Sequence, residues 1–153
     1  MARKVFISFH YDRDAWRVSQ VRNSWVTKPD HEASRFLDKA EWEAIERQGK
    51  QAIQNWIDSQ LKGTSVTVIL IGAETSGREW VKYEIKKSST DGKGMLGIYI
   101  HNLKDSAGKT DTKGTNPFTQ FGYTKYKTYD WVNDDGYNNL PTWIEAAAKD
   151  AGR

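Results

Sequence analysis

With 153 residues, 37% of them hydrophobic, the chain is long enough to form one domain (residues 1–153) around a substantial core. Its net charge of +3 is only mildly basic, and no Lys/Arg arm of the kind that follows nucleic acid is present. The absence of cysteine excludes disulfides and thiolate metal sites, and three scattered histidines make no recognisable metal pair, so no metal is expected.

No segment approaches the ~20 consecutive apolar residues of a membrane span. The apolar run at the N-terminus, "VFISF", is too short for a signal peptide. We therefore expect a cytoplasmic protein that binds neither nucleic acid nor membrane.

The first elements predicted are a strand, a helix and a second strand. "KVFISFH", residues 4–10, is apolar and rich in β-formers, which is typical of a strand buried on both faces. Asp12 or Asp14 can then cap a helix over residues 15–26. "ASRFLD", residues 33–38, is the candidate for the second strand.

The middle of the chain predicts a helix followed by the clearest strand. Apolar residues at helical spacing run from Trp42 to Leu61, with a polar gap at residues 48–50. Gly63 is expected to end this helix. "SVTVILIG", residues 65–72, follows as a strand.

The second half continues the alternation of helices and strands. A helix over residues 79–88 is followed by a strand over residues 94–103. The polar residues 104–122 are predicted to form a long surface loop. A last strand (125–131) and a helix beginning at Pro141 (141–151) complete the order.

This alternation predicts an α/β fold with an open, mostly parallel sheet and helices on both faces. Ligands of such sheets bind beyond the C-terminal ends of the strands, where the strand order reverses. If the first strand is central, its end brings Ser8, His10 and Tyr11 to that crevice. The helix that follows "SVTVILIG" begins at the same edge, and Trp80 and Glu84 share one of its faces.

Four segments of the chain resemble a TIR-like domain, and in particular the B proteins of the Thoeris antiphage defence system. They are "KVFISFHYDRD", "FLDKAEWEAI", "SVTVILIGAETSGREWVKYEI" and "GMLGIYIHNLKD". The similarity extends from Lys4 to about Trp131, and the T-S-x-R-x-W-V-x-Y-E-I element carries most of its specificity. The resemblance implies a flavodoxin-like fold.

The resemblance also implies an activity. Catalytic TIR domains cleave the nicotinamide–ribose bond of NAD with one glutamate, which corresponds here to Glu84. NAD would be the substrate, and no cofactor is implied. The B proteins are expected to turn NAD into a cyclic ADP-ribose-type messenger that activates a separate effector protein. Self-association or a phage-derived trigger would control this activity.

Several residues are candidates to hold the substrate. Trp80, Phe6 and Tyr11 could pack on nicotinamide or adenine, while Ser8 and His10 could bond to ribose or phosphate. Structural roles compete with each of these. An exposed glutamate is usually only solvated, Trp80 and Phe6 could belong to the core, and His10 could simply hydrogen-bond at a strand end.

Two other functions remain open. A non-catalytic TIR-type interaction module would need neither Glu84 nor its aromatic neighbour. A receiver-like phosphoacceptor domain would need an acidic cluster at the strand ends, and Asp12 is the only acid beside the first strand's end. There is no G-x-G-x-x-G, so hydride transfer on a Rossmann site is not supported.

Overall fold

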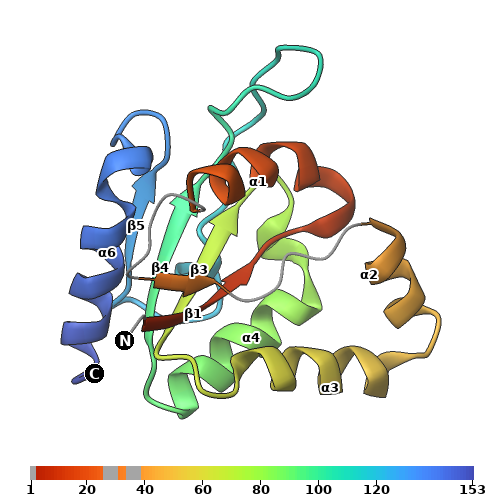
Figure 1. Ribbon diagram of the computed structural model, residues 1–153, viewed down its shortest axis with the longest axis vertical. Helices are drawn as coiled ribbons and strands as arrows, with labels where there is room; N and C mark the ends of the chain where they lie inside the picture. Colours follow the sequence, from red (N-terminus) through yellow and green to blue (C-terminus); the bar gives the residue numbers. More distant parts are fainter. Residues whose placement is uncertain (1–2, 26–30, 34–38) are drawn as a thin grey trace.

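The computed structural model describes residues 3–25, 31–33 and 39–153, without the side chains of residues 11–13, 25 and 39. Within these residues lies a five-stranded, fully parallel sheet in the order β2-β1-β3-β4-β5 (Figure 1). The strands are β1 (Arg3–Ser8), β2 (His31–Ala33), β3 (Val66–Ile71), β4 (Gly94–Tyr99) and β5 (Lys127–Asp130). The strand order reverses between β1 and β3, which confirms the predicted flavodoxin-like architecture.

Helices cover both faces of the sheet (Figure 1). One face is covered by α1 (Tyr11–Trp25) and α6 (Gly136–Asp150). The other is covered by α2 (Lys39–Glu46), α3 (Lys50–Leu61), α4 (Glu79–Thr90) and the short α5 (Pro117–Gln120). All of β3 is buried, because its side chains alternate between the two layers: Val68 and Leu70 face α1 and α6, whereas Ile69 and Ile71 face α4.

Some helix boundaries differ from the prediction. The helix expected over 42–61 is two helices, because Gly49 adopts φ 97° and ends the continuous path. The polar gap at residues 48–50 marked this break. α1 begins at Tyr11, so Asp12 and Asp14 lie inside it and neither is its cap. α6 begins at Gly136 and Pro141 lies in its interior.

The strand predictions also need correction. β2 lies at His31–Ala33 and shares Ala33 with the predicted segment, whose residues 34–38 are outside the described residues. β4 ends at Tyr99 rather than at Leu103. The predicted surface loop contains α5, whose Phe118 is fully buried against β3 and β4 residues. Residues 104–122 are therefore not a surface loop throughout, because α5 contributes to the core.

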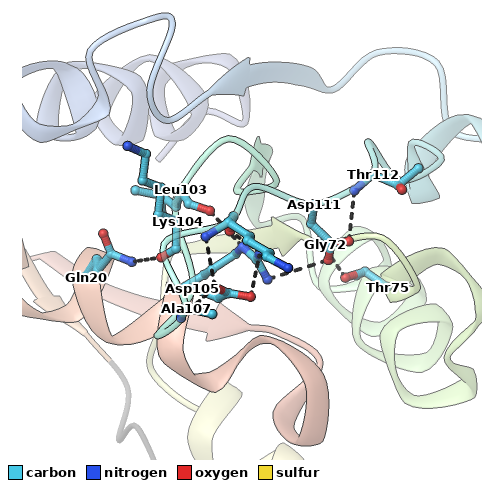
Figure 2. A network of polar contacts seen from close by, with 11 residues as sticks. Gln20, Gly72, Thr75, Leu103, Lys104, Asp105, Ala107, Asp111 and Thr112 are labelled. Carbon is cyan, nitrogen blue, oxygen red and sulfur yellow. Dashed lines mark hydrogen bonds and ion pairs between the residues drawn. The ribbon is translucent and has the colours of Figure 1, made fainter.

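Arg17 of α1 anchors the loop between β4 and α5. Figure 2 shows this loop, with Leu103, Asp105 and Asp111 labelled. Its guanidinium donates to the carbonyl oxygens of Leu103 (2.8 Å) and Lys109 (2.9 Å). The carboxylates of Asp105 and Asp111 lie 3.8 and 3.6 Å from the same group. Because Arg17 is only 6% exposed, this loop is fixed to the body of the domain.

Close backbone contacts join three segments at the C-terminal edge of β3. A Cβ atom on Gly72 would overlap the buried carboxylate of Asp14 in α1. A Cβ atom on Gly114, in the loop after β4, would overlap the Gly72 carbonyl oxygen. Only glycine permits these approaches, so the edge of the sheet where the site is expected is densely packed on the α1 side.

Candidate functional site

A pocket opens at the C-terminal end of β1, on the sheet face covered by α3 and α4. It encloses about 550 Å³ of space, including the part open to solvent. β1 supplies its floor, α4 one wall, and α2 and α3 the other. Its lining residues are Phe6, Ile7, Ser8, Phe9, Trp42, Trp56, Ile57, Arg78, Trp80, Val81 and Glu84.

The polar centre of the pocket is a pair of buried side chains. Side chains alternate along a strand, so Phe6 and Ser8 of β1 point to the same face. Glu84 lies in the second turn of α4 and points back at this strand. The Ser8 hydroxyl donates a 2.6 Å hydrogen bond to Oε1 of Glu84. The two residues are 2% and 6% exposed.

The environment of Glu84 favours its neutral form. Burial raises the pKa of this carboxyl from its ordinary 4.5 to about 8, against the opposite effect of the Ser8 hydrogen bond. Sequence reasoning placed Glu84 at a partly exposed helix position, and this was wrong. A buried acid with a strongly raised pKa in a pocket is typical of functional sites, although structural groups can show the same shift.

Aromatic rings form much of the pocket wall. Trp42 and Trp56 meet edge to face with their centroids 6.0 Å apart. Trp80 contacts Tyr83 in the same way at 5.7 Å, and the Tyr83 hydroxyl donates to Asp58 of α3. These contacts fix the rings in the pocket wall, where a flat, cationic or heterocyclic group could stack.

The structure brings together four of the six residues predicted for the site. Phe6, Ser8, Trp80 and Glu84 all line the pocket, and their roles in binding and catalysis stay predictions. His10 is buried, but it is absent from the described walls of the pocket. Tyr11 begins α1, and its side chain lies outside the described residues.

The lining residues that sequence reasoning did not propose for the site include Trp56 and Arg78. Trp56 was assigned to a helix core by its apolar spacing, and helical spacing alone does not separate core from pocket wall. Arg78 directly precedes α4, and only its position two residues before Trp80 links it to the site. Trp42 was interpreted only as the start of the same apolar spacing, yet it also lines the pocket.

The described residues contain neither a metal-binding cluster nor a membrane-spanning helix. No group of three or more His, Asp or Glu side chains among them is placed to hold a metal ion. Within the same residues, no helix combines the length and the apolar character needed to cross a bilayer.

A parallel sheet in this order, with a pocket beside the strand-order reversal, defines a flavodoxin-like domain, and the TIR-like domains are one class with this architecture. Comparison with known families agrees. The family described as "Thoeris protein ThsB, TIR-like domain" matches residues 6–105. The chain therefore belongs to the ThsB TIR-like family.

A curated relative covers nearly the whole chain. The protein named "Putative cyclic ADP-D-ribose synthase ThsB1" from Bacillus cereus (strain MSX-D12) is 35% identical over 191 aligned residues, which cover 94% of this chain and 100% of that protein. Because the alignment is longer than the 153 residues of this chain, the relative contains segments that this chain lacks.

Proposed function

We propose that this protein cleaves the nicotinamide–ribose bond of NAD and closes the remaining ADP-ribose into a cyclic messenger. The observation that carries the proposal is the buried Glu84 carboxyl, held by Ser8 at the bottom of an aromatic-walled pocket. The name of the Bacillus cereus relative, a cyclic ADP-D-ribose synthase, supports the same reaction. NAD is the substrate, and the proposal requires no cofactor.

The bond cleavage needs little help from a general acid. The nicotinamide ring of NAD is a cationic leaving group, and it takes the electron pair of the breaking C1′–N bond to depart as a neutral base. Positive charge then develops on the ribose carbon and ring oxygen. A single carboxylate beside that carbon stabilises the charge, whereas an ordinary glycosidase needs a second carboxyl group to protonate its leaving group.

Glu84 can become this carboxylate when the substrate binds. Burial raises the pKa of Glu84 to about 8, which keeps the carboxyl largely protonated at neutral pH. A pyridinium cation placed beside it favours the ionised form and lowers that pKa. The Ser8 hydroxyl donates to the same carboxyl group and favours ionisation as well. Substrate binding and activation of Glu84 are therefore coupled.

The fate of the ribose carbon decides the product. Attack by water gives linear ADP-ribose, whereas attack by a ring nitrogen of the substrate's own adenine gives a cyclic product. Each reaction also releases nicotinamide and one proton. Ring closure needs the internal nucleophile near the carbon and water kept away. The rings of Trp42, Trp56 and Trp80 around Glu84 provide apolar walls suited to excluding water.

We place the protein in antiphage defence, with its activity controlled by infection. In this proposal the cyclic product diffuses to a separate effector protein and activates it. Association of several copies, or a factor produced by the phage, completes or opens the site. The purified chain alone is then expected to turn over NAD only slowly.

The test is incubation of the purified protein with NAD, with and without lysate from phage-infected cells, followed by mass analysis of the products. Glu84→Gln keeps the size and the neutral shape of the side chain, so it should stay folded and lose about 10²–10³-fold in rate. Glu32→Gln alters an exposed carboxylate on β2 and serves as the matched control.

The competing function is a non-catalytic interaction module that assembles with other TIR-like surfaces. A folded Glu84→Gln protein that makes the product at the parent rate would contradict the catalytic role of Glu84. If no nicotinamide is released even with infected lysate, the proposed enzymatic activity is wrong and the interaction module is favoured.

A further inference from the structure

A second depression adjoins the Glu84 pocket at Trp80. It lies between the α2–α3 region and the start of α4. Its lining residues are Glu46, Lys50, Ile53, Gly77, Arg78, Glu79 and Trp80. Arg78 and Trp80 line both hollows, so the two are neighbours with these side chains at their common border.

The chemistry of the second depression suits a nucleoside better than a phosphate. Ile53 and Trp80 offer apolar surface on which a base can lie. The exposed carboxylates of Glu46 and Glu79 accept hydrogen bonds from ribose hydroxyls or an exocyclic amine, and they repel phosphate. Lys50 lies 3.9 Å from Glu79, so its charge is partly balanced.

Arg78 at the border gives the Glu84 pocket a cation for phosphate. It is the only Lys or Arg among the described residues that line the Glu84 pocket. The side chain is half-buried, and none of the hydrogen bonds and ion pairs in the described part of the structure involves its guanidinium. The planar guanidinium can pair with phosphate oxygens through two parallel hydrogen bonds.

We propose that Arg78 binds the diphosphate of the dinucleotide and that the depression beside Ile53 and Glu46 receives its adenosine half. This inference rests on the proposed function, since it divides the same substrate between two subsites. The nicotinamide ribose lies beside Glu84, the diphosphate crosses the border at Arg78, and the adenine lies on the far side of Trp80. This is a recognition pose, and ring closure requires the adenine to leave the second depression.

Binding of ADP tests the second subsite without any chemistry, because ADP carries adenosine and diphosphate but no nicotinamide. The measurement is calorimetric titration of ADP into the parent and into Arg78→Gln, Glu84→Gln and Arg47→Gln. Arg47 is an exposed arginine outside both hollows, which makes it a matched control. Melting temperatures establish that each variant is folded.

The expected result is a Kd for ADP at least 10-fold higher in Arg78→Gln and unchanged in the other two variants. Inorganic pyrophosphate should bind the parent more weakly than ADP. Equal ADP affinity in the parent and Arg78→Gln, or no saturable binding of ADP to the parent at millimolar concentration, would overturn the proposal. Equal affinity for pyrophosphate and ADP would overturn the adenosine assignment.

The outcome is separable from that of the proposed function. Arg78-dependent binding of ADP together with uncleaved NAD would leave a nucleotide-diphosphate site on a protein that is not an NAD-cleaving enzyme. Conversely, if NAD cleavage needs Glu84 while ADP binds equally well with and without Arg78, the proposed enzymatic activity would stand and the Arg78 subsite would be wrong.

Discussion

The Ser8 hydroxyl and the Glu84 carboxyl are joined by a 2.6 Å hydrogen bond although 76 positions separate them in the chain. The bond connects the end of β1 to the second turn of α4 at the floor of the pocket. Burial raises the pKa of Glu84, and the Ser8 bond lowers it. Because these two effects oppose each other, changing either residue should change the protonation of the site in a known direction.

The first prediction concerns stability against pH. Glu84 has an ordinary pKa of 4.5 when unfolded and about 8 when folded, so between these values the folded protein holds the extra proton. The free energy of unfolding contributed by this group is therefore fully present below about pH 4.5, and it decreases as the pH rises to about 8. The Gln side chain of Glu84→Gln does not titrate, so this variant shows no such decrease in stability.

The measurement is the melting temperature of the parent and of Glu84→Gln from pH 5 to pH 9. Other groups titrate equally in both proteins, so the difference isolates Glu84. As the pH rises, the stability of Glu84→Gln relative to the parent should increase by at least about 1 kcal/mol, or roughly 2–4 °C in melting temperature. Above about pH 8 the difference should level off, because Glu84 is then ionised in both the folded and the unfolded parent. A difference that is constant across the range would show that Glu84 is ionised throughout.

The second prediction separates positioning by Ser8 from a purely structural role. Ser8→Ala removes the donor that favours ionised Glu84, so the acid limb of the pH–rate profile should move to higher pH. A hydrogen bond to an ionised group contributes about 1.5–3 kcal/mol, so the rate at pH 7 should fall at least ~10-fold. Much of this loss should be recovered at alkaline pH.

The double variant provides the control for Ser8. With Gln at position 84 there is no ionisation to favour, so adding Ser8→Ala to Glu84→Gln should have little further effect on rate. If the two changes instead reduced the rate independently, Ser8 would act on the substrate rather than through Glu84.

The third prediction concerns Trp80, which sequence reasoning left undecided between core and ligand wall. The side chain is half-buried and packs against the cluster of Phe6, Trp42 and Ile57. Trp80→Ala should therefore cost stability of about 1–3 kcal/mol, less than a fully buried Trp. Loss of a stacking surface worth about 1–3 kcal/mol should also raise KM for NAD roughly 5–150-fold.

Trp80→Phe keeps an aromatic face and should recover most of the affinity. Steady-state kinetics under activating conditions and thermal melts measure both effects. If Trp80→Ala lowers the melting temperature but leaves KM unchanged, the side chain is a core residue alone.

Local sequence patterns predicted the layers of this fold well. Buried strands such as "VTVILI" carry continuous apolar runs, and the alternation with helical spacing fixes which strands are parallel. Boundaries were less predictable, because they depend on backbone geometry at single residues. Gly49 at φ 97° and Asp135 at φ 53° set the starts of α3 and α6, and each could also have stood in an ordinary turn.

The site was predictable only in part, for a physical reason. The resemblance to TIR-like domains identified Glu84, but the local sequence "WVKYEI" does not predict that this carboxyl is buried. Its burial arises from Ser8, 76 positions away, and from the tryptophans of α2 and α3. The same limit applies to Arg78, whose place between two hollows depends on the packing of α4 against α3.

The last prediction concerns Arg17, which fixes the loop after β4. Arg17→Met keeps the apolar stem but leaves the Leu103 and Lys109 carbonyls without their donor, at a cost of about 1–3 kcal/mol. Freed from α1, the loop should open more often, and trypsin should then cleave after Lys104 and Lys109 faster than in the parent. Mass analysis of timed digests identifies those cuts. Gln20→Ala removes a single exposed bond to the Lys104 carbonyl, so it should accelerate them only slightly. Unchanged cleavage at both lysines in Arg17→Met would mean that the loop is held by its own turns and not by α1.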